Sequence, residues 1–395
     1  MRTFPSDPII QNYADLLVQY ALEVQPGQKV RFIIHELAKR MAYALQRSIL
    51  KAGAIPLPVI RLDGLERQFF ERATAEQIAQ SYPLAMYAGL VQTMDAIVHI
   101  EPQSGVNEFR GLEEQTRGMQ QAYAPIRALL NDKERNGKFK WTVALWPTKE
   151  LAAEVGLSLK DYWKQIIVGC NLDHDDPVSK WRSIDAQLAV IKDKLNKLSI
   201  NRLHVVGPNV DLWVTMGAMR RWVTGSGRNV PGYEIFFSPD WRGTHGWISF
   251  DDTPLYYNGV KIEGVRLQFD HGQLISATSR TNPLSLALLL SIPGAERLGE
   301  FSLTSNLSRI TLPMGDTLYD ENRRGNMHIA LGASYPDSYT GDQSMMTSAD
   351  WVNLGFNDPD CATHVDFITV QSREVHALLN DARVIKIYEN GEFLV

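Results

Sequence analysis

The segment KVRFIIHELAKRMAYALQRSILKAGAIPLPVI, residues 29–60, decides the fold of the first half of the chain. Two short β-rich runs, KVRFII (29–34) and PLPVI (56–60), flank a stretch whose apolar residues recur at helical spacing. A strand, a helix and a second strand in this order predict a βαβ unit with parallel strands. The runs AIVHI (96–100) and KWTVALW (140–146) predict two more strands, so we expect an open, largely parallel sheet covered by helices.

The second half of the chain has a different pattern. After a charged helix predicted over residues 185–198, the segment LYYNGVKIEGVRLQFDHGQLISA (255–277) alternates apolar and polar residues around two turns. The turns are Asn258-Gly259 and Asp270-His271-Gly272, and both are typical of hairpins. This segment therefore predicts a β-meander.

A chain of 395 residues is too long for one simple core, because single cores stop growing near ~250–300 residues. We expect an α/β domain over residues 1–190 and an α+β domain with the β-meander over residues 191–395. The formal charge is 40 − 45 = −5, and the sequence has no basic stripe with interleaved aromatic residues. Nucleic acid is therefore not an expected partner.

Cysteine usage and the N-terminal sequence favour a cytoplasmic location. Cys170 and Cys361 are the only cysteines and form no CxxC pair, which argues against a disulfide framework. The N-terminus lacks the charged and apolar segments of a signal peptide. The longest apolar run, LALLL (286–290), is far too short to span a bilayer, so we expect a soluble protein without a membrane partner.

Three short motifs resemble known sites but lack a part that the chemistry needs. HELAK (35–39) has lysine where the second zinc-binding histidine of HExxH would stand. DHDD (173–176) precedes a proline, where acidic residues usually make local hydrogen bonds in a turn. GSGRNVPG (225–232) lacks the GxGxxG spacing and its strand–turn–helix context, so no nucleotide or other organic cofactor is expected.

Acidic residues and histidines in the C-terminal half stand beside predicted strands and Gly-rich turns. Glu234 lies among apolar residues in NVPGYEIFFSPD (229–240), and Glu300 follows a glycine in RLGEFSL (297–303). A carboxylate in such a setting is costly unless it is paired or bound to a cation. Each of these residues alone, like His328, has a simpler interpretation as an outward-facing or hydrogen-bonded group. Several of them in one domain favour a shared positive centre.

The segment THVDF (363–367) adds a pair of groups with a defined direction. His364 and Asp366 are two residues apart, so on a strand they project from the same face. A histidine and an aspartate so placed are a compact start of a ligand set for Zn, Mn, Co or Fe. The remaining ligands must come from other segments.

Together these segments resemble the thermophilic metalloprotease family, which includes aminopeptidases T, S and II. The resemblance runs nearly end to end, beginning with YADLLVQYALEVQPGQKV (13–30) and DPVSKWR (176–182). Its most specific parts are four segments in the same order: NVPGYE (229–234), LGE (298–300), TLYDENRRGNMHIALGASY (317–335) and HVDF (364–367).

The resemblance implies a metalloaminopeptidase that removes residues from peptides with a free N-terminus, using two divalent metal ions (Zn, Co or Mn). By position, the implied metal ligands are Glu234, Glu300, Glu321, His328, His364 and Asp366. Glu300 would bridge the metals, and Glu300 or Glu321 would act as the general base. Tyr335 would donate a hydrogen bond to the developing oxyanion. The N-terminal domain would control substrate access and form a homodimer.

Two segments depart from the family pattern. DENRRGNMH (320–328) has a longer spacing between DEN and the histidine, which puts the role of Glu321 in question. The stretch 336–363 is expanded, and we interpret it as an active-site flap that alters specificity.

Two other functions stay open at the level of sequence. His328, His364 and Asp366 alone form the 2-His-1-carboxylate set of a mononuclear non-haem Fe(II) enzyme, such as a ring-cleaving dioxygenase. That site would have no need of Glu234 and Glu300. The other alternative is a metal-binding protein that has lost its activity.

Overall fold

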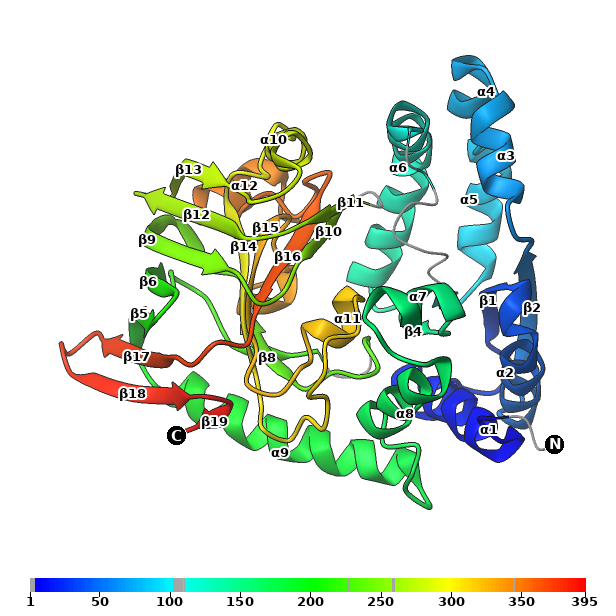
Figure 1. Cartoon of the computed structure of the whole chain (residues 1–395), viewed down its shortest axis with the longest axis horizontal. Helices are drawn as coiled ribbons and strands as arrows, with labels where there is room; N and C mark the ends of the chain where they lie inside the picture. Colours follow the sequence, from blue (N-terminus) through cyan, green and yellow to red (C-terminus); the bar gives the residue numbers. More distant parts are fainter. Residues whose placement is uncertain (1–3, 102–108, 110, 226–227, 258–259, 344) are drawn as a thin grey trace. The chain divides into compact units, whose positions relative to one another are not determined.

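The computed structural model describes residues 4–101, 109, 111–225, 228–257, 260–343 and 345–395 (Figure 1). The chain divides into two compact units, Met1–Arg182 with Ser226–Val230 and Ser183–Gly225 with Pro231–Val395. Each unit has its own sheets and its own hydrophobic clusters.

The first unit is built on a four-stranded parallel sheet with the order β2-β1-β3-β4. Its strands are β1 (Lys29–His35), β2 (Ile55–Arg61), β3 (Ala96–Glu101) and β4 (Lys140–Leu145). The bounds agree with the four predicted runs to within one residue at each end. The parallel pairing of β1 with β2 confirms the βαβ prediction.

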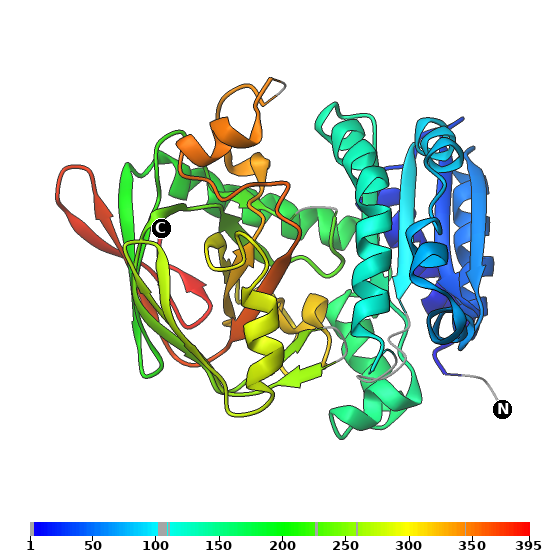
Figure 2. The ribbon, with the colours of Figure 1, turned by 90° about the horizontal axis from the view of Figure 1, so that it is seen from above.

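Helices cover both faces of this sheet (Figure 2). On one face, Ile33 and Ile97 pack with Val91 of α5 (Leu84–Thr93) and Ile126 of α6 (Glu113–Arg135). The opposite face of β1, next to α2 (Lys39–Lys51), is formed by alternate buried residues. The other helices of this unit are α1 (Asp7–Asp15), α3 (Leu65–Arg72), α4 (Ala75–Ala79), α7 (Lys149–Glu154) and α8 (Leu159–Gly169).

The weak sequence motifs of this unit have local structural roles. In HELAK, His35 ends β1, its Nδ1 accepts a hydrogen bond from Leu37 N (3.2 Å), and α2 begins at Lys39. In DHDD, Asp176 accepts hydrogen bonds from Ser179 N (3.0 Å) and Ser179 Oγ (2.7 Å) at the start of α9 (Pro177–Lys197). Within the described residues neither motif joins a metal-binding group. Residues 226–227 of GSGRNVPG lie outside the described residues.

The second unit contains two antiparallel sheets, a separate hairpin and short helices. The larger sheet has eight strands: β13 (Gln273–Thr278), β12 (Val265–Asp270), β9 (Asp240–Phe250), β6 (Val210–Thr215), β5 (Ile200–Gly207), β17 (Glu374–Leu379), β18 (Val384–Glu389) and β19 (Glu392–Phe393). The smaller has five: β16 (His364–Thr369), β15 (Met327–Gly332), β14 (Leu298–Thr304), β8 (Glu234–Phe237) and β7 (Val223–Thr224). The hairpin is β10 (Leu255–Tyr257) with β11 (Val260–Ile262), and the helices include α10 (Pro283–Leu290), α11 (Thr317–Asp320) and α12 (Ser348–Asn353).

The predicted β-meander is present as two hairpins that belong to different sheets. β10 and β11 pair only with each other, whereas β12 and β13 extend the eight-stranded sheet. The predicted turn between β12 and β13 has left-handed backbone at His271 (φ +47°) and Gly272 (φ +76°). A Cβ at Gly272 would lie 2.4 Å from Trp241 O, so the turn requires glycine there. The Asn258-Gly259 turn lies outside the described residues.

The five-stranded sheet has one apolar and one polar face, and all residues of β14 and β15 are buried. On the apolar face, the ring of Trp222 lies 4.6 Å from that of Phe237 and 6.3 Å from that of Phe301. Phe367 packs against Phe250 of the eight-stranded sheet, with ring centroids 5.5 Å apart. Because side chains alternate along a strand, the polar residues collect on the opposite face, and that face is also buried.

Two expectations from composition concern the chain as a whole. In the part of the chain that the structure describes, no helix combines the length and apolar character needed to cross a bilayer. Cys170 and Cys361 form no disulfide.

His99 of β3 gives the stability of the first unit a dependence on pH. Burial, together with the charges of Arg61 and Arg31, lowers the pKa of His99 to about 4. The unfolded chain binds this proton at a higher pH, near about 6.5, so stability falls as the pH drops from about 6.5 towards 4. At pH 5 this group removes roughly 2 kcal/mol of the unfolding free energy.

We predict that His99→Gln reduces the loss of stability between pH 8 and pH 5 by about 2 kcal/mol, because glutamine takes up no proton. Urea unfolding at the two pH values measures this difference. His174→Gln, at an exposed position, is the matched control and should follow the wild-type protein. Equal losses in His99→Gln and wild-type protein would contradict the prediction.

Candidate metal centre

The buried polar face of the five-stranded sheet collects five of the six predicted ligands. Ala330 of β15 lies opposite Glu300 of β14 on one side and Asp366 of β16 on the other. His328 stands two residues before Ala330 and therefore on the same face. The same alternation places the two remaining strand residues there: Glu234 of β8 and His364 of β16.

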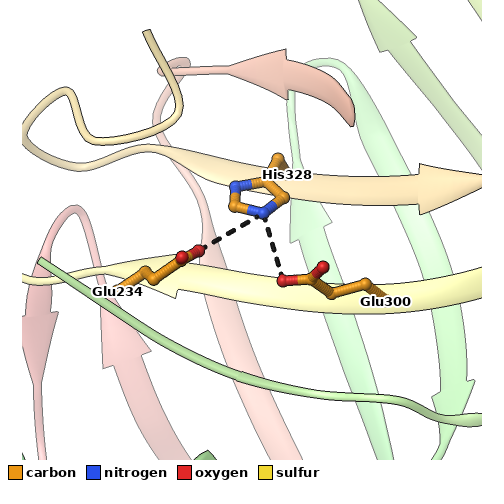
Figure 3. A group of neighbouring side chains, drawn as sticks. All are labelled: Glu234, Glu300 and His328. Atoms are coloured by element: carbon orange, nitrogen blue, oxygen red, sulfur yellow. Dashed lines mark ion pairs between the residues drawn. The ribbon is translucent and has the colours of Figure 1, made fainter. Parts of the chain in front are cut away.

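Figure 3 shows the imidazole of His328 between two glutamates. Its Nε2 lies 3.4 Å from Glu234 Oε2 and 3.4 Å from Glu300 Oε1. The other carboxylate oxygen of Glu300, Oε2, lies 3.2 Å from His364 Nε2. His364 Nε2 in turn lies 3.4 Å from Asp366 Oδ1. Carboxylates and imidazoles therefore alternate across the face, with Glu300 in the middle.

Three overlapping groups of side chains have ligand atoms close enough together to hold a metal ion, within 4.8 Å of one another. The groups are Glu234 with Glu300 and His328, Glu300 with His364 and Asp366, and Glu321 with His328 and Asp366. Glu300, His328 and Asp366 each belong to two groups. The structure thus brings all six predicted residues into one cluster.

Glu321, which is not on a strand, lies directly after α11. Its backbone carbonyl accepts hydrogen bonds from Thr304 Oγ1 (2.7 Å) and Asn326 Nδ2 (2.5 Å). Its Oε1 accepts a hydrogen bond from Asn322 Nδ2 (3.3 Å). The longer spacing between DEN and His328 therefore does not separate Glu321 from the other members of the cluster.

Burial makes the carboxylates of this cluster hold protons more tightly than they would in water. Burial raises the pKa of Glu234 to about 7, against the opposing effect of His328. Burial also raises the pKa of Glu321 well above its usual range, and the carboxylates of Glu234 and Asp366 raise it further. Loss of hydration on burial is the main cause of both shifts, and repulsion between the carboxylates adds to it.

For the two histidines and for Glu300, pairing with opposite charges decides the direction of the pKa shift. Burial alone would lower the pKa of His328, but Glu300 and Glu234 raise it to about 9. Burial likewise opposes the charge on His364, and Asp366 and Glu300 raise the pKa of His364 well above its usual range. Burial would raise the pKa of Glu300, but hydrogen bonds from both histidines lower it. Glu300 therefore stays ionised.

The donor set fits divalent metal ions. Four carboxylates carry four negative charges when ionised, which two divalent cations would neutralise in place of bound protons. His364 Nδ1–H donates a hydrogen bond to Ala333 O (2.7 Å), which leaves Nε2 directed at the carboxylates. A hydrogen bond of this kind orients a metal-binding histidine. Mixed carboxylate and imidazole donors suit Zn, Mn or Co.

Solvent reaches the cluster at β16. The side chains of His364 and Asp366 are 21% and 15% exposed, whereas those of Glu300 and His328 are at most 4% exposed. Tyr335 stands at this more open side, with its ring centroid 4.8 Å from that of His364. Burial and the nearby carboxylates, Glu300 first among them, raise the pKa of Tyr335 well above its usual range, so its hydroxyl keeps the proton.

Among the described residues, sequence reasoning missed four buried polar residues that contact the cluster: Ser302, Thr304, Asn322 and Asn326. Ser302 Oγ donates a hydrogen bond to Glu234 Oε2 (2.7 Å). Its position two residues after Glu300 is a usable signal, because a strand places both on one face. Asn322 and Asn326 lie in an irregular connection, where no period indicates a direction.

The expanded stretch 336–363 is a folded excursion between Tyr335 and His364 rather than an extended loop. Ala333 N donates a hydrogen bond to Thr363 O (2.7 Å), which closes its two ends together. The excursion contains α12 and a hydrophobic cluster of its own: Tyr339, Trp351 and Phe356. The residues that flank this stretch, Tyr335 and His364, therefore belong to the site, and its described interior packs around its own hydrophobic cluster.

Comparisons with known proteins agree with the sequence resemblance. The chain matches the family described as thermophilic metalloprotease (M29) over residues 6–393. It is 27% identical over 415 residues to aminopeptidase PepS of Streptococcus thermophilus, with 98% of each chain covered. Its identity to aminopeptidase 2 of Geobacillus stearothermophilus is 25% over 418 residues, with 97% of each covered. Its fold is similar to wild-type AmpT from Thermus thermophilus (TM-score 0.83, 22% identity, 98% and 99% of the two chains covered).

We predict that Glu321→Gln stabilises the metal-free protein at pH 8 and has no effect at pH 4. The folded protein holds the Glu321 proton more tightly than the unfolded chain, so this group destabilises the fold progressively above pH ~4.5. Glutamine removes that destabilisation. Urea unfolding in the presence of a chelator measures the effect.

His328→Leu should act in the opposite direction under the same conditions. It leaves Glu234 buried without a cation and Glu300 with His364 alone, which should lower the unfolding free energy by about 3–5 kcal/mol. A Glu321→Gln protein that is less stable than wild type at pH 8 would overturn this description of the site.

Proposed function

Because the chain belongs to the thermophilic metalloprotease family, we propose that it is a metal-dependent aminopeptidase with two divalent ions in its buried cluster. The substrates are peptides with a free N-terminus, and the reaction is hydrolysis of the first peptide bond. The names of two relatives that align along nearly the whole chain, both aminopeptidases, support this activity.

The arrangement of Glu300 is the observation that carries the proposal of two ions. Its two carboxylate oxygens face two different imidazoles, Oε1 at 3.4 Å from His328 Nε2 and Oε2 at 3.2 Å from His364 Nε2. A carboxylate that shares its oxygens between two nitrogen donors is placed to bridge two cations. Its lowered pKa keeps it ionised for that purpose.

The overlapping groups supply ligands for each ion. Glu234, Glu300 and His328 would hold one, and Glu300, His364 and Asp366 the other, with Glu321 completing the set. Zn, Co and Mn all accept such mixed oxygen and nitrogen ligands. When bound, such ions would supply the Lewis acidity that makes a water molecule a stronger nucleophile and stabilises the reacting oxygens during hydrolysis.

Glu321 is the residue that we propose moves the proton from the attacking water to the leaving amine. Glu300 is less suited to this role, because both of its oxygens are engaged by histidines. Glu321 follows α11 and is held through its backbone carbonyl, with its carboxylate near His328 and Asp366. A general base must lie within hydrogen-bonding reach of the proton it takes, and Glu321 would take it from a water held beside these ligands.

Tyr335 would stabilise the developing negative charge on the carbonyl oxygen of the substrate. Its ring contacts the imidazole of His364 at the more exposed side of the cluster. Its position is fixed by the hydrogen bond from Tyr335 N to Ser238 Oγ (2.7 Å) and by ring packing on Phe236. A hydrogen-bond donor that is already held in place stabilises the transition state more than a mobile one, because it does not have to be ordered during the reaction.

The alternative of a mononuclear Fe(II) dioxygenase is less well supported. It needs His328, His364 and Asp366 around one ion, but none of the three metal-binding groups among the described residues contains both histidines. It also leaves Glu234 and Glu300 buried without a role. A metal-binding protein without activity is tested by the same measurements as the proposed function.

Three further features belong to the proposal: a homodimer, a cytoplasmic location, and a role for residues 1–190 in substrate access and dimerisation. The homodimer and the role of residues 1–190 are proposed from the family resemblance, and the location from the two cysteines without a CxxC pair. Sedimentation of the purified protein tests the first of them.

We predict two divalent ions per chain by elemental analysis and release of the first residue from aminoacyl amides. A chelator should abolish the activity, and Co²⁺, Zn²⁺ or Mn²⁺ should restore it. N-acetylated peptides should not be cleaved, since the enzyme requires a free amine. One bound iron with O₂ uptake would favour the dioxygenase, and two ions without hydrolysis of any peptide would favour the inactive protein.

Tyr335→Phe should lower kcat by about 10²–10³-fold, as expected for loss of one oxyanion donor. KM and the number of bound ions should stay close to wild type, because the hydroxyl is proposed to act in the transition state. Steady-state kinetics and elemental analysis on the same preparation separate these effects. An unchanged kcat would remove Tyr335 from the mechanism.

A further inference from the structure

Asn326 occupies a special place in the connection from α11 to β15. Its side chain is fully buried, and its Nδ2 contacts two predicted ligands. Nδ2 donates a hydrogen bond to the carbonyl oxygen of Glu321 (2.5 Å) and lies 3.3 Å from His328 Nδ1. One carboxamide therefore links the backbone of a glutamate on one side to the ring of a histidine on the other.

The backbone of Asn326 is fixed, which leaves its side chain little freedom. Its carbonyl accepts hydrogen bonds from Thr304 N (2.9 Å) and Tyr388 Oη (3.3 Å), and its own N–H donates to Arg323 O (2.9 Å). These bonds continue the β14–β15 pairing by one residue beyond Met327. The longer connection of this chain is thereby anchored at the point where it enters β15.

The two histidines of the cluster are oriented in parallel ways but by different groups. In each ring Nε2 faces carboxylates, and the other ring nitrogen, Nδ1, lies within hydrogen-bonding distance of a further polar group. His364 uses the backbone carbonyl of Ala333, which no substitution removes, whereas His328 depends on the side chain of Asn326. The orientation of His328 is therefore sensitive to a single residue.

The carboxamide of Asn326 suits either tautomer of His328. Its Oδ1 is buried and has no hydrogen-bond partner. A half-turn of the carboxamide would present this acceptor to Nδ1 in place of the donor Nδ2. The turned carboxamide gives up its hydrogen bond to the carbonyl of Glu321 and must draw back from that oxygen, which keeps the hydrogen bond from Thr304 Oγ1. When Nε2 holds a cation, Nδ1 carries the ring proton, and Oδ1 of the turned carboxamide would accept it.

We propose that Asn326 is a positioning residue that sets the affinity of the ion held by Glu234, Glu300 and His328. It acts by fixing the ring of His328 at the point where the longer DEN-to-histidine connection of this chain enters β15. The inference rests on the proposed function. Substitution of a residue that hydrogen-bonds to a metal ligand typically changes the metal affinity by about 10–100-fold.

A buried asparagine can also serve the fold alone, and Asn209 provides the matched control. Asn209 is buried in the same unit, and its Nδ2 donates hydrogen bonds to Ser249 O (2.6 Å) and Thr369 Oγ1 (3.1 Å). Its Oδ1, like that of Asn326, has no hydrogen-bond partner. Asn209→Ala therefore removes the same chemistry and volume without touching a predicted ligand.

The test titrates Co²⁺ into chelator-treated wild-type protein and into the Asn326→Ala and Asn209→Ala variants. Isothermal calorimetry gives the affinity for each ion, and the visible absorption of Co²⁺ reports its coordination. We expect Asn326→Ala to bind one of two ions about 10–100-fold more weakly and to change the spectrum of that ion. Asn209→Ala should match the wild type in both. If the alanine variant at 326 fails to fold, Asn326→Ser replaces it, because serine keeps a single short donor, and the same loss is expected.

Wild-type affinity for both ions in the Asn326 variant would overturn the inference. An equal loss of affinity in the Asn209 variant would overturn it as well, because the effect would then be general to buried asparagines. These outcomes leave the proposed function intact. A wild-type protein that binds no Co²⁺ at all would instead refute the proposed function, and the two failures are therefore distinguishable.

Discussion

The concentration of four carboxylates at one sheet face is the constraint on which the structure of the second unit depends: Glu234, Glu300 and Asp366 lie on the strands, and Glu321 joins them from the end of α11. Glu234 and Glu300 lie within 3.4 Å of the same imidazole nitrogen, in an interior where unpaired charge is strongly unfavourable. Without cations the cluster holds protons, as the raised pKa values of Glu234, His328 and Glu321 indicate. The surrounding structure must therefore hold like charges together against their repulsion.

Strand register is the means by which the fold does so. Four neighbouring strands present every second residue to one face, and the opposite face is filled with aromatic and aliphatic side chains such as Phe237 and Phe301. A slip of one residue in any of these pairings would exchange the two faces and bury the carboxylates in the apolar core. The packing of the apolar face thus fixes the positions of the charged groups as well.

Irregular segments supply what the sheet cannot. Glu321 comes from the end of a short helix and is tied to the sheet through Thr304, while Asn322 joins its carboxylate to Tyr233 N beside Glu234. Tyr335, which precedes the folded excursion, stands at the more exposed side of the site. Five of the predicted ligands are therefore held by regular pairing, and the two groups proposed for catalysis, Glu321 and Tyr335, by irregular segments.

The sequence by itself determined the four strands of the first unit, and its resemblance to a known family identified the clustered residues. The strands at 29–34, 56–60, 96–100 and 140–146 were predictable to within one residue, because helical and strand periods are local properties of the chain. His364 and Asp366 could be paired from their spacing alone, for the same reason. Only the tertiary structure decided that the two predicted hairpins belong to different sheets, that Glu321 stays in the cluster, and that Asn326 contacts it. These facts depend on register and connection geometry between segments far apart in sequence, and no local period carries that information.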